Sequence, residues 1–442
     1  MIQLSDHFDS KRLLRFTFPS IIMMVFTSIY SVVDGFFVSN FAGKTPFAAV
    51  NFIFPVLMIL GCAGFMFGTG GGALIARTVG EGDRKKANEI FSLLVYTSIV
   101  CGVVLGAGGM ILLRPLAAAM GAQGQLLEDS VLYGRIILAS LPFYILQYEF
   151  QCLFATAEKP KLGLFVTAAA GVTNMALDAL FVAGFRWGLA GAAAATAVSQ
   201  LAGGVIPLVY FGRENSSLLR LVRCRFDGRA LLQTCSNGAS ELMSNVSASI
   251  VSMLYNVQLM AQAGEDGVAS YGVLMYVSLV FQAIFIGYAV GTAPIVSYHY
   301  GAGNREELRG LLRRSVMLIG VFSLLMCLAG ETMGRPLSLL FVGYDPGLMD
   351  MTAHAFSIFS LSFLFSGLAI FGSSFFTALN DGLTSALISF LRTLVFQCAA
   401  VIVFPILWGL DGIWWSIPAA EVMAVAVTVL FLAGKREKYG YF

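Results

Sequence analysis

Long apolar stretches alternate with short polar segments along the whole chain. Twelve of these stretches approach or exceed the roughly 20 mostly apolar residues that a helix needs to cross a bilayer. They cover residues 14–39, 46–77, 88–113, 131–156, 161–184, 189–212, 230–260, 268–298, 308–330, 352–378, 383–407 and 411–433. The period-two alternation of membrane β-strands is absent, so the pattern predicts an all-α bundle of twelve transmembrane helices.

The composition excludes several functional classes. Hydrophobic residues make up 58% of the chain and charged residues 12%, against about 25% charged residues in a typical soluble domain. So few charges exclude a soluble enzyme, a disordered regulator and a nucleic-acid-binding protein. The seven cysteines show no C-x-x-C spacing and the three histidines lie far apart, so neither a disulfide framework nor a metal or haem site is indicated.

The positive charges orient the predicted helices. If both termini are cytoplasmic, 21 of the 27 Lys and Arg residues fall on the cytoplasmic side and five on the other. Those five are Lys44, Arg114, Arg135, Arg186 and Arg335, whereas Arg392 lies inside an apolar stretch. Cytoplasmic loops carry the excess of Lys and Arg, so we expect a multi-pass protein of the cell (plasma) membrane with both termini in the cytoplasm. No cleavage site follows the first stretch, which we interpret as a retained helix.

The two halves of the chain repeat one another at a nearly constant shift of 221 residues. The matched segments are Gly80-Glu-Gly82-Asp-Arg84 with Gly301-Ala-Gly303-Asn-Arg305, Arg114-Pro-Leu116 with Arg335-Pro-Leu337, and Trp187-Gly-Leu189-Ala-Gly191 with Trp408-Gly-Leu410-Asp-Gly412. We therefore predict an N-terminal lobe over 1–212, a basic cytoplasmic linker over 213–229 and a C-terminal lobe over 230–442. Six helices per lobe is an even number, so the repeats are parallel and surround a central cavity, as in transporters whose halves rock.

Acidic residues inside the predicted helices are candidates for function, because an Asp at a helix centre costs about 2.5–3.5 kcal/mol on insertion scales. Asn174 and Asp178 are spaced i, i+4 and share one helix face. Asp34 lies in the first predicted helix one turn after Tyr30, and Thr196 lies within the sixth. If they converge, these oxygens suit a proton or Na⁺, since burial and a second carboxylate both favour the neutral form of a carboxyl group. Alternatively, Asn174 and Thr196 form packing hydrogen bonds and Asp178 lies near the water interface.

Comparison of the halves favours the functional alternative. At the shift of 221, the four polar positions correspond to Tyr255, Val395, Ala399 and Ile417. Residues that the shared fold requires should recur in both halves, and these do not. The cluster is thus peculiar to the first half.

The second half has acidic residues of its own. Glu241 and Asn245 are spaced i, i+4 and could bind a cationic substrate, or Glu241 could pair with Arg392. Glu421 is open to the same two roles. Glu149 lies near a predicted helix end, where a side chain can extend to the membrane surface.

Several motifs resemble those of multidrug and toxic compound extrusion (MATE) transporters, particularly their MepA-like branch. They are the stretch from Pro19 to Asp34, Val50-Asn51-Phe52 with Pro55, Gly80–Arg84, Ala157-Glu158-Lys159-Pro160-Lys161, Asn174–Asp178, Gly188–Thr196 with Ser199-Gln200, and Tyr298-His-Tyr300-Gly301-Ala302. The resemblance implies twelve helices in two lobes around a V-shaped cavity, and export of organic cations and drugs driven by H⁺ or Na⁺. It implies a proton or cation site at Asp34, Asn174, Asp178 and Thr196. Glu158-Lys159-Pro160 and Asn380-Asp381-Gly382 depart from the family pattern in two cytoplasmic turns.

The sequence therefore predicts a non-enzymatic, secondary active multidrug efflux antiporter. Its coupling ion would be H⁺ or Na⁺, with no cofactor and no metal other than Na⁺ at the cation site. Tyr30, Glu241, Asn245 and Glu421 are the predicted substrate-binding residues. Its expected partners are small organic cations or drugs and the lipid bilayer but no nucleic acid, and we expect a monomer.

The main alternative is a lipid-linked oligosaccharide flippase of the same superfamily, which would need a basic cavity for a pyrophosphate. An intramembrane enzyme would need a His cluster, a metal set or an activated nucleophile, none of which is apparent. A receptor or scaffold would leave the acidic cluster unexplained.

Overall fold

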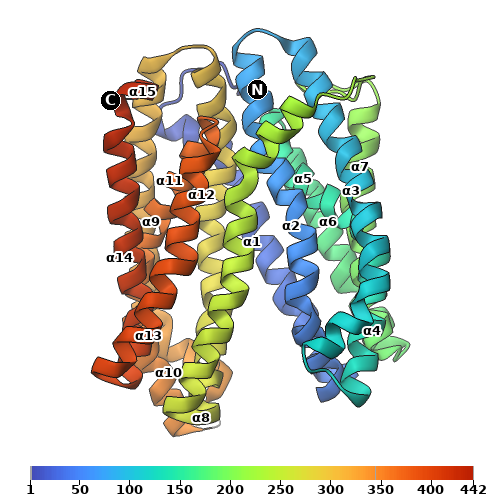
Figure 1. Ribbon diagram of the computed structural model, residues 1–442, viewed down its shortest axis with the longest axis vertical. Helices are drawn as coiled ribbons and strands as arrows, with labels where there is room; N and C mark the ends of the chain where they lie inside the picture. The colour runs from blue at the N-terminus through green and yellow to red at the C-terminus, as the bar shows by residue number, and fades with distance from the viewer. Residues whose placement is uncertain (1, 344, 442) are drawn as a thin grey trace.

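The computed structural model describes residues 2–343 and 345–441, except for the side chains of Ser39 and Lys44, and this part of the chain is helical without strands. The first half contains α1 (Ser10–Phe37), η1 (Val38–Ala42), α2 (Lys44–Gly80), α3 (Arg84–Ala119), α4 (Gly124–Ala139), α5 (Leu141–Thr156), α6 (Pro160–Asp178), η2 (Ala179–Gly184) and α7 (Gly188–Gly212). The second contains α8 (Gly228–Gly301), α9 (Arg305–Val342), α10 (Pro346–Phe359), η3 (Ser360–Ser362), α11 (Phe363–Ala378), α12 (Gly382–Phe390), η4 (Leu391–Phe396), α13 (Gln397–Trp408), α14 (Leu410–Gly434) and α15 (Arg436–Tyr439). In Figure 1, α9 to α14 lie on one side and α2 to α7 on the other.

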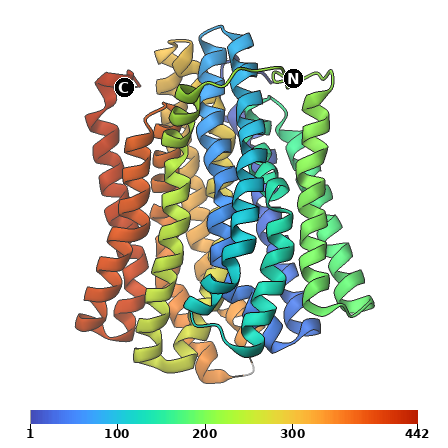
Figure 2. The same ribbon diagram turned by 45° about the vertical axis from the view of Figure 1, so that its right-hand side comes forward.

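These helices account for twelve membrane crossings. Ten helical segments of the described chain are long and apolar enough to cross a membrane, and α4 with α5 forms a further span, bent by 60°. The bend lies beside Pro142, whose ring cannot be accommodated in a straight helix. α8 is 74 residues long and is interrupted by the non-helical backbone of Gly264, so it supplies two spans. The twelve predicted helices are confirmed, and both chain ends lie at one end of the bundle (Figure 2).

Glycine contacts between α2 and α8 show that the two halves are related by approximate two-fold symmetry. A methyl group at Gly80 would lie 2.1 Å from the carbonyl oxygen of Tyr298, and one at Gly301 would lie 2.1 Å from that of Arg77. Both the glycines and their carbonyl partners are separated by 221 residues, so one contact is the repeat of the other. Only glycine permits such an approach of two backbones. These contacts close the bundle at the end that holds the termini.

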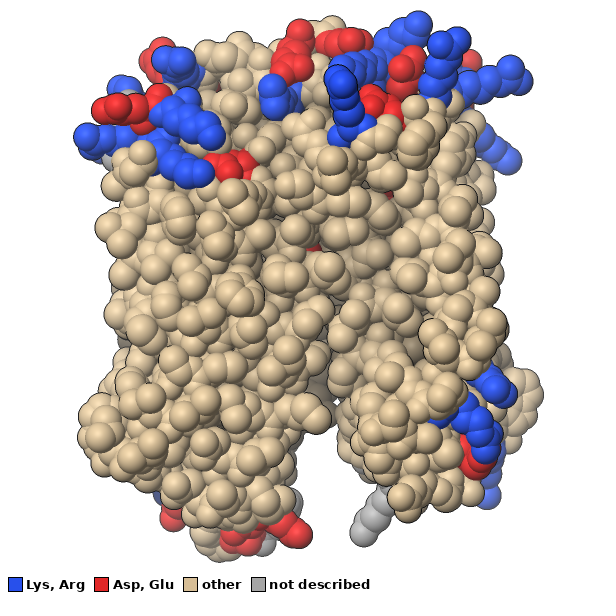
Figure 3. Space-filling model, in the orientation of Figure 1, with Lys and Arg blue, Asp and Glu red and all other residues tan. Residues whose placement is uncertain are grey.

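Charged side chains separate clearly from the membrane-spanning surface. Lys and Arg gather at the end of the molecule that carries both termini, and a broad belt without charged side chains follows it (Figure 3). A smaller group of charges, which includes Arg114 paired with Glu128, lies at the opposite end. This separation matches the charge pattern on which the predicted orientation rests.

The segment Gln3–Asp9, here called the N-terminal strap, joins the two halves at the closed end. The backbone N–H of Leu4 donates to Glu158 Oε1 in the turn between α5 and α6 (2.7 Å), and that of Phe8 donates to Glu307 Oε1 on α9 (2.9 Å). The Leu4 and Phe8 side chains are fully buried. Glu158 is one of the two departures from the family pattern, and in this structure its side chain accepts a hydrogen bond from the N-terminal strap.

Replacing Glu307 with Ala is expected to lower thermal stability. Its buried carboxylate also bonds His7 Nδ1 (2.6 Å) and Arg314 Nη1 (3.3 Å), and stranding such partners costs about 1–3 kcal/mol. Thermal unfolding in detergent, followed by a thiol dye on buried cysteines, measures the shift. Glu306→Ala is the matched control, because Glu306 is exposed in the same helical turn. Equal melting temperatures for the two variants would contradict a role for the strap.

Asp381, in the other unusual turn, anchors the C-terminal end of the chain. Its carboxylate accepts hydrogen bonds from Lys435 Nζ (2.6 Å) and from the Tyr439 hydroxyl (2.7 Å). Burial opposes ionisation, but these donors together with Thr384 hold the pKa of Asp381 below its usual value. The acidic turn is thus neutralised by the end of the chain itself.

Candidate functional site

The two halves enclose a central cavity that opens as a cleft at the end opposite the termini (Figure 3). It has three chambers that share lining residues, and Leu279 lines all three. The N-half chamber, of about 220 Å³, is lined by Tyr30, Asp34, Tyr133, Gln147, Asn174 and Thr196, among others. The inner chamber, of about 370 Å³, lies between the halves and includes Thr69, Cys152, Glu241, Asn245, Ser373 and Arg392. The outer chamber, of about 930 Å³, includes Tyr255, Tyr271, Tyr276, Arg392, Gln397 and Glu421.

Asp34 lines the N-half chamber, and Asp178 lies close to Asp34 without lining that chamber. Asp34 lies near the end of α1 and Asp178 is the last residue of α6, and each is followed within a few residues by π-helical turns, which are frequent at functional sites. The two carboxyl groups are close enough to interact directly. Asp178 is fully buried within the protein.

A close contact between α1 and α6 produces this arrangement. A methyl group at Gly171 would meet the rings of Phe26 (2.5 Å) and Tyr30 (2.8 Å). Asn174 and Asp178 follow Gly171 by three and seven residues, so all three lie on the helix face that contacts α1. The glycine therefore brings both polar groups against the first helix.

The remaining predicted ligands also lie at this chamber. Asn174 Nδ2 and Thr196 Oγ1 are buried and have no hydrogen-bond partner within the described residues. The Thr196 hydroxyl lies beside the hydroxyl of Tyr133. One oxygen of Asp34 and both oxygens of Asp178 likewise accept no hydrogen bond from the described residues. The structure thus brings Asp34, Asn174, Asp178 and Thr196 together, as the sequence predicts, and leaves their ion-binding role to be tested.

Sequence reasoning overlooked uncharged neighbours of this cluster. Tyr133 on α4 lies close to both aspartates and to Thr196, and Gln147 Nε2 donates to the Tyr30 hydroxyl (3.5 Å). Gln147 lines the chamber and corresponds to Leu368 in the second half. A comparison of the two halves that included amide side chains as well as acidic ones would have identified Gln147.

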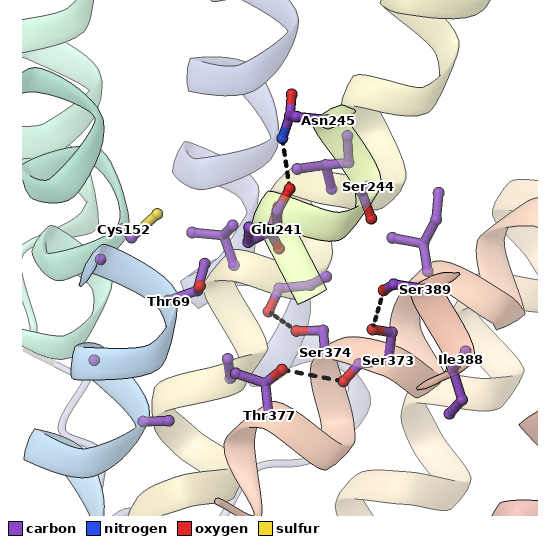
Figure 4. A pocket seen from close by; sticks show the side chains of 18 of the residues that line it. Thr69, Cys152, Glu241, Ser244, Asn245, Ser373, Ser374, Thr377, Ile388 and Ser389 are labelled. Atoms are coloured by element: carbon purple, nitrogen blue, oxygen red, sulfur yellow. Dashed lines mark hydrogen bonds between the residues drawn. The ribbon is translucent and has the colours of Figure 1, made fainter. Parts of the chain in front are cut away.

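Glu241 and Asn245 lie together on α8 at the inner chamber (Figure 4). Asn245 Nδ2 donates to the Glu241 backbone carbonyl (2.8 Å) and approaches Cys62 Sγ (3.2 Å). The Glu241 carboxylate has no ion-pair or hydrogen-bond partner in the described part of the chain. Its charge is therefore available to the cavity.

Arg392 pairs with Glu421 rather than with Glu241. Arg392 Nε lies 2.9 Å from Glu421 Oε2, and Nη2 lies 2.9 Å from Oε1. Planar two-point contacts of this kind are the strongest form of the Arg–carboxylate bond. The hypothesis of a Glu241–Arg392 pair is wrong, and the Glu421 charge is matched within the protein.

Glu149 does not extend to the membrane surface. Its side chain is fully buried on α5, and neither carboxylate oxygen has a partner among the residues that the structure describes. It does not line any of the three chambers. The expectation of an extended side chain is wrong because α5 turns this face inward.

A family model named MatE matches residues 19–180 and 242–402, which together make up most of the chain. The chain belongs to the MatE family. The two matched segments begin 223 residues apart and end 222 apart, close to the repeat shift found in the sequence. The family match thus confirms both the resemblance and the duplicated architecture.

Named relatives match almost the whole length of this chain. "Multidrug export protein MepA" of Staphylococcus aureus (strain MRSA252) is 23% identical over 429 residues, covering 97% of this chain and 94% of the relative. MepA of Staphylococcus saprophyticus has the same identity and coverage.

Solved structures show the same fold. One is described as an "outward-facing conformation of a multidrug resistance MATE family transporter of the MOP superfamily", with a TM-score of 0.93 and 21% identity over 99% of this chain and 98% of that one. A MOP superfamily transporter from Pyrococcus furiosus has a TM-score of 0.91 and 21% identity, covering 98% and 97%.

Proposed function

We propose that the protein is an antiporter that exports cationic or amphipathic organic compounds in exchange for H⁺ or Na⁺. The observation that carries the proposal is the Asp34–Asp178 pair at the N-half chamber, with free oxygens on both residues. Two carboxylates in such contact repel one another unless a cation or a proton lies between them. The pair can therefore bind and release one positive charge as its surroundings change.

Coupling requires that ion and substrate prefer different conformations. An ion drives transport only if its affinity differs between the two conformations, and the effect on the substrate is reciprocal. Ion binding at Asp34 and Asp178 cancels negative charge beside the cavity. A cationic substrate then loses attraction and leaves, which couples ion entry to export.

The inner and outer chambers supply the substrate contacts in this proposal. Glu241 provides an unmatched negative charge, Asn245 an amide and Tyr30 an aromatic face at the adjoining N-half chamber. Glu421 contributes through its pair with Arg392, which lines both the inner and the outer chamber. Large, partly apolar chambers of this kind accept varied organic molecules.

The charge distribution gives the proposed orientation. We take the basic end with both termini as cytoplasmic, so the cleft opens toward the outside. Residues 1–212 and 230–442 would then be the rocking lobes and 213–229 their cytoplasmic linker, within a monomer in the cell membrane. A lipid flippase is less well supported, because Arg392, the cation that lines the inner and outer chambers, is already neutralised by Glu421.

Transport in proteoliposomes tests the proposal. Purified protein is expected to drive accumulation of cationic dyes when a pH or Na⁺ gradient is imposed, and to show none without a gradient. Separate pH and Na⁺ gradients identify the coupling ion. Failure of both gradients, together with translocation of a lipid pyrophosphate, would contradict the antiporter and favour the flippase.

A further inference from the structure

A surface pocket of about 280 Å³ lies at the basic end of the molecule, away from the central cavity. The residues that line it come from the start of α3 and from the linker, and they are Asp83, Lys85, Lys86, Glu89, Ile90, Leu93, Arg225 and Asp227. These residues line none of the three chambers of the cavity. Because α3 belongs to the first half and the linker leads into α8, the pocket lies where the two halves are joined.

Hydrogen bonds hold the linker beside the first turns of α3 as it crosses from α7 to α8 (Figure 2). The backbone N–H of Arg220 donates to Asn88 Oδ1 (2.9 Å), and that of Val222 donates to Ser92 Oγ (2.8 Å). At a rise of about 1.5 Å per residue, the linker therefore follows α3 for roughly 12 Å from its first residue, Arg84, toward the charge-free belt. The linker residues that follow Val222 are thus fixed next to the membrane-facing surface of α3.

Basic side chains supply the unmatched charge of this pocket. Asp83 and Asp227 accept hydrogen bonds of 2.9 to 3.2 Å from backbone N–H groups at the starts of α3 and α8, so they serve as caps of these helices. The side chains of Lys85, Lys86 and Arg225 are exposed, and they form no ion pair with another residue of the described chain. Three positive charges are therefore left to an anion from outside the protein.

An exposed apolar surface continues from the pocket along α3. Leu93 lines the pocket, and Tyr96, Val100 and Val104 follow it at intervals of three or four residues, on one face of the helix. These three side chains are 44–62% exposed, and Phe226 of the linker is 78% exposed. A ligand with a phosphate in the pocket could therefore lay a hydrocarbon chain along α3, which a small water-soluble anion cannot do.

We propose that this pocket is a binding site for an anionic phospholipid from the leaflet at the basic end. Lys85, Lys86 and Arg225 donate to the lipid phosphate, as in other basic pockets beside transmembrane helices. Glu89 accepts hydrogen bonds from hydroxyl groups of the headgroup, and one acyl chain lies along α3. The bound headgroup ties the linker to the first half. The site is separate from the central cavity and does not depend on the proposed antiport function.

Native mass spectrometry of the purified protein in detergent tests the site. Phosphatidylglycerol is added over a concentration series, and the fraction of protein that carries one lipid gives its Kd. We expect tighter binding of phosphatidylglycerol than of phosphatidylcholine or phosphatidylethanolamine. Lys86→Gln/Arg225→Gln should raise the Kd at least tenfold, because two charge-assisted hydrogen bonds are lost. The matched control is Lys11→Gln/Arg313→Gln, which removes two exposed charges outside the pocket and should keep the wild-type Kd.

Competition with glycerol 3-phosphate separates a lipid from a free organic phosphate. This compound has the phosphate and hydroxyl groups without acyl chains, so it should displace the lipid only weakly. If the pocket variant fails to fold, amide hydrogen exchange of the wild type replaces it, and residues 222–228 should exchange more slowly once phosphatidylglycerol is added. An unchanged Kd in the pocket variant, equal affinity for phosphatidylcholine, full displacement by glycerol 3-phosphate or unaltered exchange at 222–228 would each overturn the lipid site.

Discussion

Replacing Asp34 or Asp178 with Asn is expected to abolish gradient-driven export while the protein still inserts and folds. Asn cannot carry the exchangeable charge, so the remaining carboxylate no longer has a partner with which to share a proton or ion. The dye ratio across the proteoliposome membrane should fall from its gradient-driven value to that of vesicles without protein. Dye binding in detergent should persist, because Glu241 and the tyrosines are unchanged.

Glu149→Gln is the matched control for these variants. Glu149 is also a buried intramembrane carboxyl group of the first half, but it lies outside the three chambers. The Glu149→Gln variant should retain gradient-driven export if coupling depends on where the acid lies relative to the chambers and not on the loss of any buried acid. Wild-type transport by both Asp variants would remove the proposed ion site.

Adding a methyl group at the two-fold-related glycines is expected to shift the conformational equilibrium. Gly80→Ala or Gly301→Ala would place a carbon 2.1 Å from a backbone carbonyl oxygen, and a backbone cannot move aside as a flexible side chain does. Overpacking costs about 1–3 kcal/mol, which corresponds to a population change of about tenfold for each 1.4 kcal/mol. The strain exists only while this end of the bundle is closed, so the conformation open at this end should gain population.

Spin labels can report this shift. Cysteines at positions 85 and 437, both exposed at the closed end, would be labelled in a background without native cysteines. The distance distribution should gain a longer component in each Gly variant. Gly108→Ala is the control, since a methyl group at Gly108 meets nothing within 4 Å. An identical distribution in all three variants would show that the glycine contacts do not hold this end closed.

The spans, the repeat and the clustering of Asp34 with Asp178 could be predicted from the sequence, because a bilayer imposes strong constraints. Apolar length, Lys and Arg placement and the cost of buried acids each leave a signal that needs no tertiary information. The i, i+4 spacing of Asn174 and Asp178 fixes their common face. The close approach of Gly171 to α1 determines that this face packs against α1. That contact could be seen only in the structure.

Pairings between helices were beyond the same reasoning. Spacing along one helix does not give its rotation relative to another, so Arg392 could be assigned to Glu241 or Glu421 with equal justification. Tyr133 was missed because attention to charge passes over a hydroxyl. Glu149 was misjudged because distance from a helix end says nothing about which neighbours cover that face.

The N-terminal strap also sets an order on biogenesis. Phe8 precedes its partner Glu307 by 299 residues in the chain. During synthesis the strap therefore stays unpaired with Glu307 until α9 begins to emerge from the ribosome. Such a contact of very long sequence separation forms late, so the first half inserts without it. Closure of the end that holds the termini becomes a late step of assembly, and a chain truncated before residue 307 cannot complete it.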